Sequence, residues 1–465
     1  MVNQVIIPQS KYELLIDIQK PRLSKQVLCL ALTFSTVGAL FITRTWVGLS
    51  TARSTREFVV GEKIENAQIT AWLHRSRLYA ESTKENKNSS RNAIVKSTDD
   101  YAKDPTGKKL VCYYSISEKM MNTTEELIPS HVDPHICTHI IVGFASVVNC
   151  TLNLGNYLWV YREIANLRIK EPKLKVMISA GGINEVNSGF PQMVRTHANR
   201  KIFIRSVLNI TKTLELDGLD IDWEFPAWNG ANSREKIFFV QLLQELRKEF
   251  SRSDQKLLLS AAVAAPDSII DQSYNIPEIA KYVDFVNLMS YDYHSYVWYY
   301  PLTGLNSPLF PRSTEKGFLA SLNVNYSTNY WIMKGMPKEK IIIGIPTYGH
   351  SYKLTNPRNH DVEAPAKGIG SLGDDSFVPY YTVCQFLQGG ANFKFLNDSL
   401  VPYAYKNDEW ISYDNIDSVI QKAKWIKSND FGGAMILSLN CDDWNSTCSR
   451  SETFPLIRAI KLALN

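Results

Sequence analysis

Short apolar runs rich in β-branched residues recur along the chain from about Lys175 onward. Each run is followed by a longer segment whose apolar positions repeat with the period of a helix. Strands that alternate with helices predict a parallel sheet covered on both faces, which places the protein in the α/β class. The runs are KVMISAGG at Lys175–Gly182, VDFVNLMSYD at Val283–Asp292, KIIIGIPTYG at Lys340–Gly349 and FGGAMILSLN at Phe431–Asn440.

One segment, LDGLDIDWEFP at Leu216–Pro226, places acids inside an apolar run. Apolar and acidic residues alternate over Leu219–Phe225, so Asp220, Asp222 and Glu224 point to one face of a predicted strand. An edge strand that shows its acids to water is the simpler alternative. It fits poorly, because apolar strands and helices precede and follow this one.

The acids make chemical sense if the strands close into a barrel. The inward face at the carboxyl end of a barrel strand forms the floor of the active site. Crowded carboxyl groups there push one another's proton affinities apart. We therefore expect Glu224 to remain protonated near neutral pH and to act as a proton donor.

LDGLDIDWEFP closely resembles the DGxDxDWE signature of the family 18 glycoside hydrolases, which comprise chitinases and chitinase-like lectins. The resemblance runs from about Lys109 to the C-terminus. It implies a (β/α)8 TIM barrel with a small α+β insertion at about residues 350–410, between the last two strands. Matching segments, in order, are VCYYS at Val111–Ser115, CTHIIVGFA at Cys137–Ala145, SAGG at Ser179–Gly182, MSYD at Met289–Asp292, GIPTYGHSY at Gly344–Tyr352 and GGAMILSLNCDDW at Gly432–Trp444.

The resemblance also implies a reaction and a role for each acid. Family 18 enzymes cleave β-1,4-linked N-acetylglucosamine with help from the substrate, whose 2-acetamido oxygen attacks the anomeric carbon. Glu224 stands at the position of the acid, Asp222 at the position that orients the acetamide, and Asp220 at a deeper position that shares a proton with Asp222. By the same resemblance Tyr291 binds the acetamido carbonyl and Asp292 holds the sugar. Further cleft residues implied in this way are Met289, Tyr348, His350, Gly181 and Gly182.

The chain departs from the family where aromatic rings normally stack on sugars. Ile183 and Leu437 stand where tryptophans are usual, Ser117 replaces another ring, and Phe225 lacks a tyrosine hydroxyl. Trp298 is a candidate for a shifted replacement. Two functions remain open: a chitinase-type hydrolase weakened by the lost rings, or a catalytically inactive lectin or decoy that binds chitin-type glycans or a protein partner.

The N-terminal region predicts attachment to a membrane. Val27–Ile42 is an uncharged, mostly apolar run of 16 residues, just short of the roughly 17–25 residues that span a bilayer. We expect a cytosolic tail at 1–26, a signal anchor in the lipid bilayer at 27–49, a polar stalk at 50–108 and the barrel at 109–465. A cleaved signal peptide, which would release a secreted protein, and a buried helix are the alternatives.

Cysteines and glycosylation sequons predict an extracellular or lumenal barrel, and therefore a single-pass type II membrane protein. The family resemblance implies two disulfides, Cys112–Cys137 and Cys384–Cys448. Whether Cys150 pairs with Cys441 remains open. Asparagines that begin an N-x-[ST] sequon without proline are Asn88, Asn122, Asn149, Asn209, Asn325, Asn397 and Asn445.

Charge and motifs narrow the list of partners. The net charge of +5 is modest and spread along the 465 residues, which argues against nucleic-acid binding. The sequence has no P-loop, dinucleotide fingerprint or zinc-ligand cluster, so we expect neither a cofactor nor a metal. The predicted partners are chitin or N-acetylglucosamine oligosaccharides and, through the N-terminal segment, the lipid bilayer.

Overall fold

The computed structural model describes residues 107–117, 126–182, 189–448 and 452–465, which all lie in one structural unit. The predicted tail and membrane segment lie outside these ranges, as do Asn88, Asn122, Ile183 and all of the predicted stalk except Gly107 and Lys108. Among the residues that are described, no helix has the length and apolar character needed to cross a membrane. The prediction of a membrane anchor therefore concerns a part of the chain that the structure does not describe.

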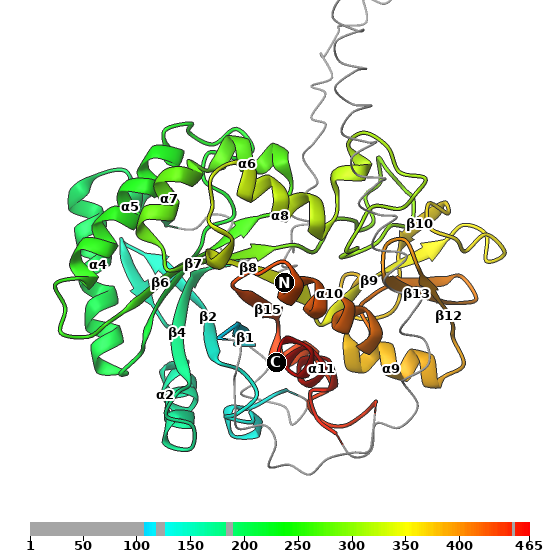
Figure 1. Ribbon diagram of the computed structural model, residues 1–465, viewed down its shortest axis with the longest axis horizontal. Coiled ribbons are helices and arrows are strands. Elements are labelled where there is room, and N and C mark those ends of the chain that lie inside the picture. Colours follow the sequence, from blue (N-terminus) through cyan, green and yellow to red (C-terminus); the bar gives the residue numbers. More distant parts are fainter. Residues whose placement is uncertain (1–106, 118–125, 183–188, 449–451) are drawn as a thin grey trace, which may run out of the picture. The chain divides into compact units, whose positions relative to one another are not determined.

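Eight parallel strands close into a barrel at the centre of Figure 1. The hydrogen-bonded order is β1-β15-β8-β7-β6-β5-β4-β2, and the pairing of β1 with β2 closes the ring. The predicted α/β barrel is thus confirmed. Its strands are β1 (Lys109–Ser115), β2 (His139–Val148), β4 (Lys175–Gly181), β5 (Gly218–Asp222), β6 (Leu258–Ala264), β7 (Phe285–Met289), β8 (Ile341–Pro346) and β15 (Gly433–Leu437), with β3 (Thr151–Asn153) antiparallel to β2.

Helices surround the strands, which explains why the strands read as continuous apolar runs. All five residues of β5 are buried, and so are all six of β8. Local capping sets several helix ends; Thr196, for example, accepts a hydrogen bond from the Asn199 backbone at the start of α4. The helices are α2 (Leu158–Asn166), α3 (Phe190–Val194), α4 (His197–Thr213), α5 (Glu235–Phe250), α6 (Asp267–Ser273), α7 (Ile276–Tyr282), α8 (Val324–Met333), α10 (Ile416–Ser428) and α11 (Pro455–Leu464).

A strand-rich insertion lies between β8 and β15, as the family resemblance implies. Its strands pair in the order β10-β9-β14-β13-β12, with β11 added to β9. One face buries aromatic rings, and Tyr403 stacks on Trp410 with 5.2 Å between ring centroids. The insertion appears in yellow and orange in Figure 1. It comprises β9 (Tyr348–Leu354), β10 (Ala366–Ile369), β11 (Phe377–Pro379), α9 (Tyr380–Gln388), β12 (Asn392–Leu396), β13 (Val401–Lys406) and β14 (Glu409–Ser412).

The acidic strand is shorter than its alternating pattern predicts. Strand β5 ends at Asp222, where its pairing with β4 stops, so Glu224 lies in the turn that follows. The apolar residues of the pattern face the helices: Trp223 stacks on Phe190 with 5.3 Å between ring centroids. Asp220 inside the barrel and Trp223 against α3 therefore follow the predicted alternation, and Trp223 does so one residue after strand pairing has ended.

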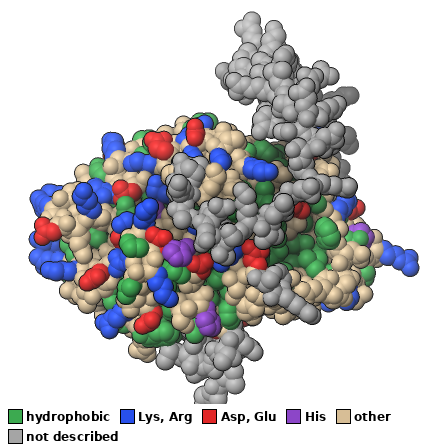
Figure 2. Space-filling view, turned by 60° about the horizontal axis from the view of Figure 1, so that its bottom comes forward, with side chains coloured by type: hydrophobic (Ala, Val, Ile, Leu, Met, Phe, Trp, Pro, Cys, Tyr) green, Lys and Arg blue, Asp and Glu red, His purple; other side chains and the backbone are tan. Residues whose placement is uncertain are grey.

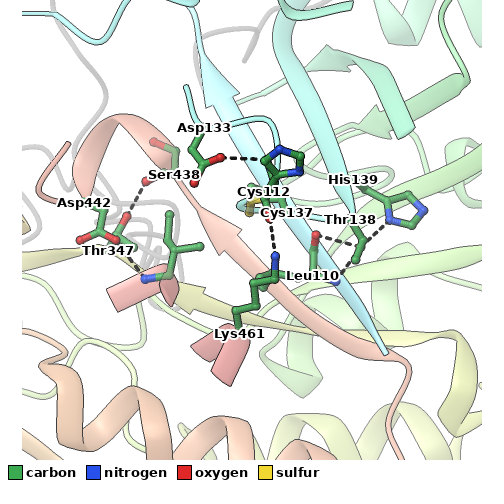
Figure 3. The surroundings of a disulfide bond; sticks show 12 residues. Leu110, Cys112, Asp133, Cys137, Thr138, His139, Thr347, Ser438, Asp442 and Lys461 are labelled. Carbon is green, nitrogen blue, oxygen red and sulfur yellow. Dashed lines mark hydrogen bonds between the residues drawn. A yellow bond between two sulfur atoms is a disulfide. The ribbon is translucent and has the colours of Figure 1, made fainter. Parts of the chain in front are cut away.

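Both predicted disulfides are present. Cys112–Cys137 joins β1 to the segment before β2, in the surroundings shown in Figure 3. Cys384–Cys448 joins α9 to the segment after β15. Among the described cysteines, Cys150 and Cys441 are buried and free, so the structure does not pair them.

Candidate active site

Asp220 lies at the centre of the barrel and is fully buried. Its Oδ2 accepts hydrogen bonds from the hydroxyls of Tyr113 and Ser179, each at 2.8 Å. Its Oδ1 accepts from the Ser260 hydroxyl at 2.6 Å and from Asn287 Nδ2 at 3.2 Å. Ser179 and Ser260 are the direct register partners of Asp220 on β4 and β6, so all three side chains share one face of the sheet. Side chains from four strands other than β5 therefore donate hydrogen bonds to this single carboxyl group.

Burial raises the pKa of Asp220, although its four hydrogen-bond donors act to lower it. Burial and the neighbouring acids also raise the pKa of Tyr113 well above its ordinary value, which keeps this hydroxyl a donor. Sequence reasoning did not assign Tyr113, Ser260 or Asn287 to the site. Polar residues inside buried apolar strands were the available signal, because such groups require partners.

Asp222 and Glu224 follow Asp220 toward the carboxyl end of the strands. Asp222 is 4% exposed and Glu224 is partly exposed, so accessibility rises along the series. Gly181 and Gly182 lie against this segment, and the Gly182 N–H donates to the Asp222 carbonyl at 2.8 Å. A Cβ on Gly181 would lie 2.1 Å from that carbonyl oxygen. The two glycines thus allow β4 to approach Asp222 closely, a backbone role distinct from the predicted substrate contact.

A second carboxylate, Asp292, follows β7 and lies at the join between barrel and insertion. Its Oδ1 accepts from the Tyr348 hydroxyl at 2.5 Å and lies 2.9 Å from His350 Nε2. Tyr348 and His350 are two residues apart on β9, so both side chains point to the same face of the strand. Tyr348 is only 2% exposed. The sequence-predicted residues Asp292, Tyr348 and His350 therefore form one cluster, with the tyrosine ring covered.

Tyr291 and Met289 lie on the inner side of this cluster. The Tyr291 ring packs edge-to-face on Tyr348, with 6.0 Å between centroids, and its hydroxyl lies 4.0 Å from the Met435 sulfur. Tyr291 and Met289 are both buried. The predicted catalytic and substrate-binding residues thus lie in β5 or at and just beyond the carboxyl ends of β4, β5, β7 and β8, as the barrel architecture requires.

Asn306 connects Asp292, which follows β7, to Tyr348 on β9. This residue was not predicted from the sequence. Its side-chain oxygen accepts from the Asp292 backbone N–H at 2.9 Å, and its amide nitrogen donates to the Tyr348 carbonyl at 3.1 Å. Asp292 has a left-handed backbone, with φ of +58°. Because this conformation is unfavourable for a residue with a Cβ, the Asn306 contact helps to hold Asp292 in place.

Aromatic surface at the mouth differs from the family pattern. Leu437, the last residue of β15, is partly buried and packs on the core beside Pro346. Phe225 is buried, which excludes it as an open platform. Trp298 is 76% exposed and contacts Tyr299 edge-on, with 5.7 Å between ring centroids. Trp298 therefore presents a free indole surface, whereas Leu437 presents none.

Two other properties bear on possible ligands. Across the described ranges, no three His, Cys, Asp or Glu side chains are grouped so as to hold a metal ion. On the face shown in Figure 2, basic and acidic side chains are interspersed.

A cavity of about 410 Å³ lies elsewhere, against α5, α6, α7 and α8, and none of the site acids lines it. Its charged groups satisfy one another: Lys334 pairs with Asp271 at 2.6 Å. The acids of the barrel remain the better candidate site.

Comparison with known proteins finds matches to one protein family. Residues 109–442 match the model of glycosyl hydrolases family 18. Mouse chitotriosidase-1 is 37% identical over 368 residues, which cover 77% of this chain and 78% of the relative. The solved structure of an immunomodulatory active chitinase from Trichuris suis, TsES1, aligns with a TM-score of 0.73 at 32% identity, over 77% of this chain and 100% of the other. Human YKL-39, described as a pseudo-chitinase with retained chitooligosaccharide binding, aligns with a TM-score of 0.72 at 38% identity, over 77% and 99%.

Proposed function

The chain belongs to family 18 of the glycosyl hydrolases, and from that premise we propose that its barrel binds and hydrolyses β-1,4-linked N-acetylglucosamine oligosaccharides. The observation that carries the proposal is the series Asp220, Asp222 and Glu224, which rises from the barrel centre to its open end. A buried acid held by four donors has no evident structural need, because an apolar residue would fill the barrel at lower desolvation cost.

In the first step, the Glu224 carboxyl group donates its proton to the glycosidic oxygen. The carbonyl oxygen of the substrate's own 2-acetamido group attacks the anomeric carbon as the bond to the leaving oxygen breaks. The product on the sugar is an oxazolinium ion, so no enzyme nucleophile is required. Partial exposure of Glu224 fits this role, since the acid must reach the substrate.

Asp222 orients the acetamide by accepting a hydrogen bond from its N–H group. It also stabilises the positive charge that develops on the ring. Asp220 lies deeper than Asp222 along β5, and under this proposal a proton shared between their carboxyl groups supports the orientation of Asp222. In the second step, Glu224 takes a proton from water, and the water oxygen attacks the anomeric carbon from the side of the departed sugar as the bond from that carbon to the acetamido oxygen breaks. This regenerates the acetamido group and the protonated Glu224. Two inversions at one carbon give retention of configuration.

The remaining residues recognise the sugar. Tyr291 hydrogen-bonds the acetamido carbonyl and thereby aims it at the anomeric carbon. Asp292 accepts from a sugar hydroxyl while Tyr348 and His350 fix its carboxylate. Because these side chains are already held in place, less conformational entropy is lost when the sugar binds.

Binding without hydrolysis is the second candidate. The specific observation in its favour is Leu437, a packed aliphatic residue at a position where the family usually has a tryptophan. The likeness to YKL-39 supports it as well, because that protein is described as a pseudo-chitinase that retains chitooligosaccharide binding. Under this proposal the acids hold sugar hydroxyl and acetamide groups but turnover is negligible.

We also propose that the barrel is extracellular or lumenal and is anchored by the segment at 27–49. Two disulfides support an oxidising compartment. Four sequon asparagines are exposed, so glycans would meet no steric barrier there: Asn149, Asn209, Asn397 and Asn445.

Two measurements on the full chain, purified in detergent, separate the candidates. Release of fluorophore from a 4-methylumbelliferyl chitotrioside reports hydrolysis, and calorimetry with chitotetraose reports binding. Turnover that disappears in Glu224→Gln supports the hydrolase. Binding without turnover supports the lectin, and absence of both rejects the proposed substrate class.

A further inference from the structure

Phe377 presents an aromatic ring at the site where Tyr348 was expected to contact the sugar. Its ring stacks on that of Tyr348 with 4.2 Å between centroids and an interplanar angle of 27°. Phe377 is 36% exposed, whereas Tyr348 is 2% exposed. The solvent-accessible ring at this point is therefore that of Phe377, and Tyr348 supports it from beneath.

A strained turn directly precedes Phe377 and sets its position. Asp375 and Ser376 both have left-handed backbones, with φ of +49° and +69°. Asp374 and Phe377 exchange two backbone hydrogen bonds across them, at 2.9 and 3.1 Å. Tight hairpins with two left-handed residues favour Asn-Gly, because glycine and asparagine tolerate such φ values best. Asp-Ser at this position is less favourable, and strain of this kind is typical of functional sites.

The turn is tied directly to the polar cluster of the candidate site. Ser376 Oγ lies 3.5 Å from His350 Nδ1, and the Ser376 carbonyl accepts from the Ser351 N–H at 2.9 Å. Phe377 is itself the register partner of His350. Since His350 contacts Asp292 through its other ring nitrogen, one rigid unit carries both the exposed ring and the carboxylate.

We propose that Phe377 is a stacking platform for an N-acetylglucosamine unit whose hydroxyl is held by Asp292. The apolar face of a pyranose ring packs on an aromatic face, and a hydroxyl at the ring edge then reaches a neighbouring carboxylate. Phe377 in this way compensates for the ring that is missing at Leu437. The inference rests on the proposed function, because it assumes that the cleft binds N-acetylglucosamine oligosaccharides.

Calorimetry of the full chain with chitotetraose tests this assignment. Phe377→Ala should weaken binding about tenfold, on the scale of single-ring stacking in other ligand sites. Phe377→Leu should weaken it by a similar factor, because leucine keeps apolar bulk but lacks a flat face. Phe377→Trp should restore or exceed the affinity of the unaltered protein. The matched control is Phe393→Ala, which removes a ring that is 62% exposed on β12 of the same insertion, and it should leave binding unchanged.

Each outcome separates this inference from the proposed function. If the unaltered protein does not bind chitotetraose, the proposed substrate class is wrong. If it binds, and Phe377→Ala or Phe377→Leu binds within twofold of it or more tightly, Phe377 covers Tyr348 and is not a platform. A Phe377→Ala variant with a lowered melting temperature leaves the decision to Phe377→Leu, whose bulk preserves the cover over Tyr348.

Discussion

The ammonium of Lys422 lies 2.7 Å from the carboxylate of Asp414, and both side chains are buried, at 0% and 1% exposure. Lys422 also donates to the Ser307 hydroxyl at 2.9 Å, which in turn donates to the Ser290 carbonyl at 2.7 Å. Ser290 directly precedes Tyr291. A buried ion pair between α10 and the segment that precedes it is thus connected through two serines to the loop that carries the candidate substrate contacts.

Lys422→Met should lower the free energy of unfolding by about 3–5 kcal/mol, because it leaves the Asp414 carboxylate buried without its ammonium partner. Chemical denaturation measures the change. The control is Lys281→Met, which breaks a solvent-exposed pair at 2.6 Å and should lower the free energy of unfolding far less. Equal losses in the two variants would contradict a special role for burial. The double change Lys422→Met with Asp414→Leu should recover part of the loss.

Glu224→Gln should abolish hydrolysis of a chitotrioside while leaving chitotetraose binding within a few-fold of the original. Glutamine keeps the shape of the side chain but carries no transferable proton. The comparison variant is Glu278→Gln, an exposed glutamate paired with Lys281, which should keep full activity. Activity near the original level in Glu224→Gln would remove Glu224 as the acid.

Leu437→Trp should tighten chitotetraose binding by about 1–2 kcal/mol, below the value of a full core burial. An indole at the end of β15 would lie beneath the sugar, although neighbours packed around Leu437 must move to admit it. If the acids are active, turnover should rise as well. Leu462→Trp, at an exposed position on α11, controls for a non-specific gain. A folded Leu437→Trp that binds no better would favour a cleft remodelled for another ligand.

Stability should fall as pH rises toward neutrality because of Asp442. Burial raises the pKa of Asp442 from 3.8 to about 7. Asp442 also accepts hydrogen bonds from backbone N–H groups at the start of α11, such as that of Ile457 at 3.0 Å, and these lower its pKa by less than burial raises it. The folded state therefore holds a proton that the unfolded state releases above about pH 4. The resulting stabilisation is complete below pH 4 and is lost as pH rises through 7, a span of at most about 4 kcal/mol.

Asp442→Asn should flatten this dependence, since an amide does not ionise. Denaturation midpoints at pH 5 and pH 8 measure the slope in each protein. The control is Asp430→Asn, whose side chain is 90% exposed and which should keep the original slope. An unchanged slope in Asp442→Asn would assign the pH dependence to other groups.

N-linked glycans should be present on the chain when it is made in a eukaryotic cell. Enzymatic removal of N-glycans should increase electrophoretic mobility, and Asn397→Gln should remove one step of the shift. Asn392→Gln is the matched control, because Asn392 is exposed on the same insertion but begins no sequon. If removal of N-glycans leaves the mobility unchanged, the barrel does not pass through a glycosylating compartment.

Local pattern was sufficient for the α/β class and for the alternation of the acids, whereas closure into a barrel followed from the family resemblance. Short apolar runs rich in β-branched residues, separated by helical segments, predict a covered parallel sheet, and the structure has one. The pattern did not predict where β5 ends. Strand length depends on partners, and the pairing of β5 with β4 stops at Asp222 although the alternation continues to Phe225.

The sequence by itself determined the α/β fold class and, through family resemblance, the barrel and the two disulfides; it predicts that the three acids share one face. Only the tertiary structure decided what surrounds those acids. Ser179 lies 41 residues from Asp220 in sequence and Asn287 lies 67 residues away, yet both donate to its carboxyl group. Periodicity is a local property of the backbone and specifies which way a side chain points. Its partner across the barrel depends on strand order and register, which form only when distant strands pair.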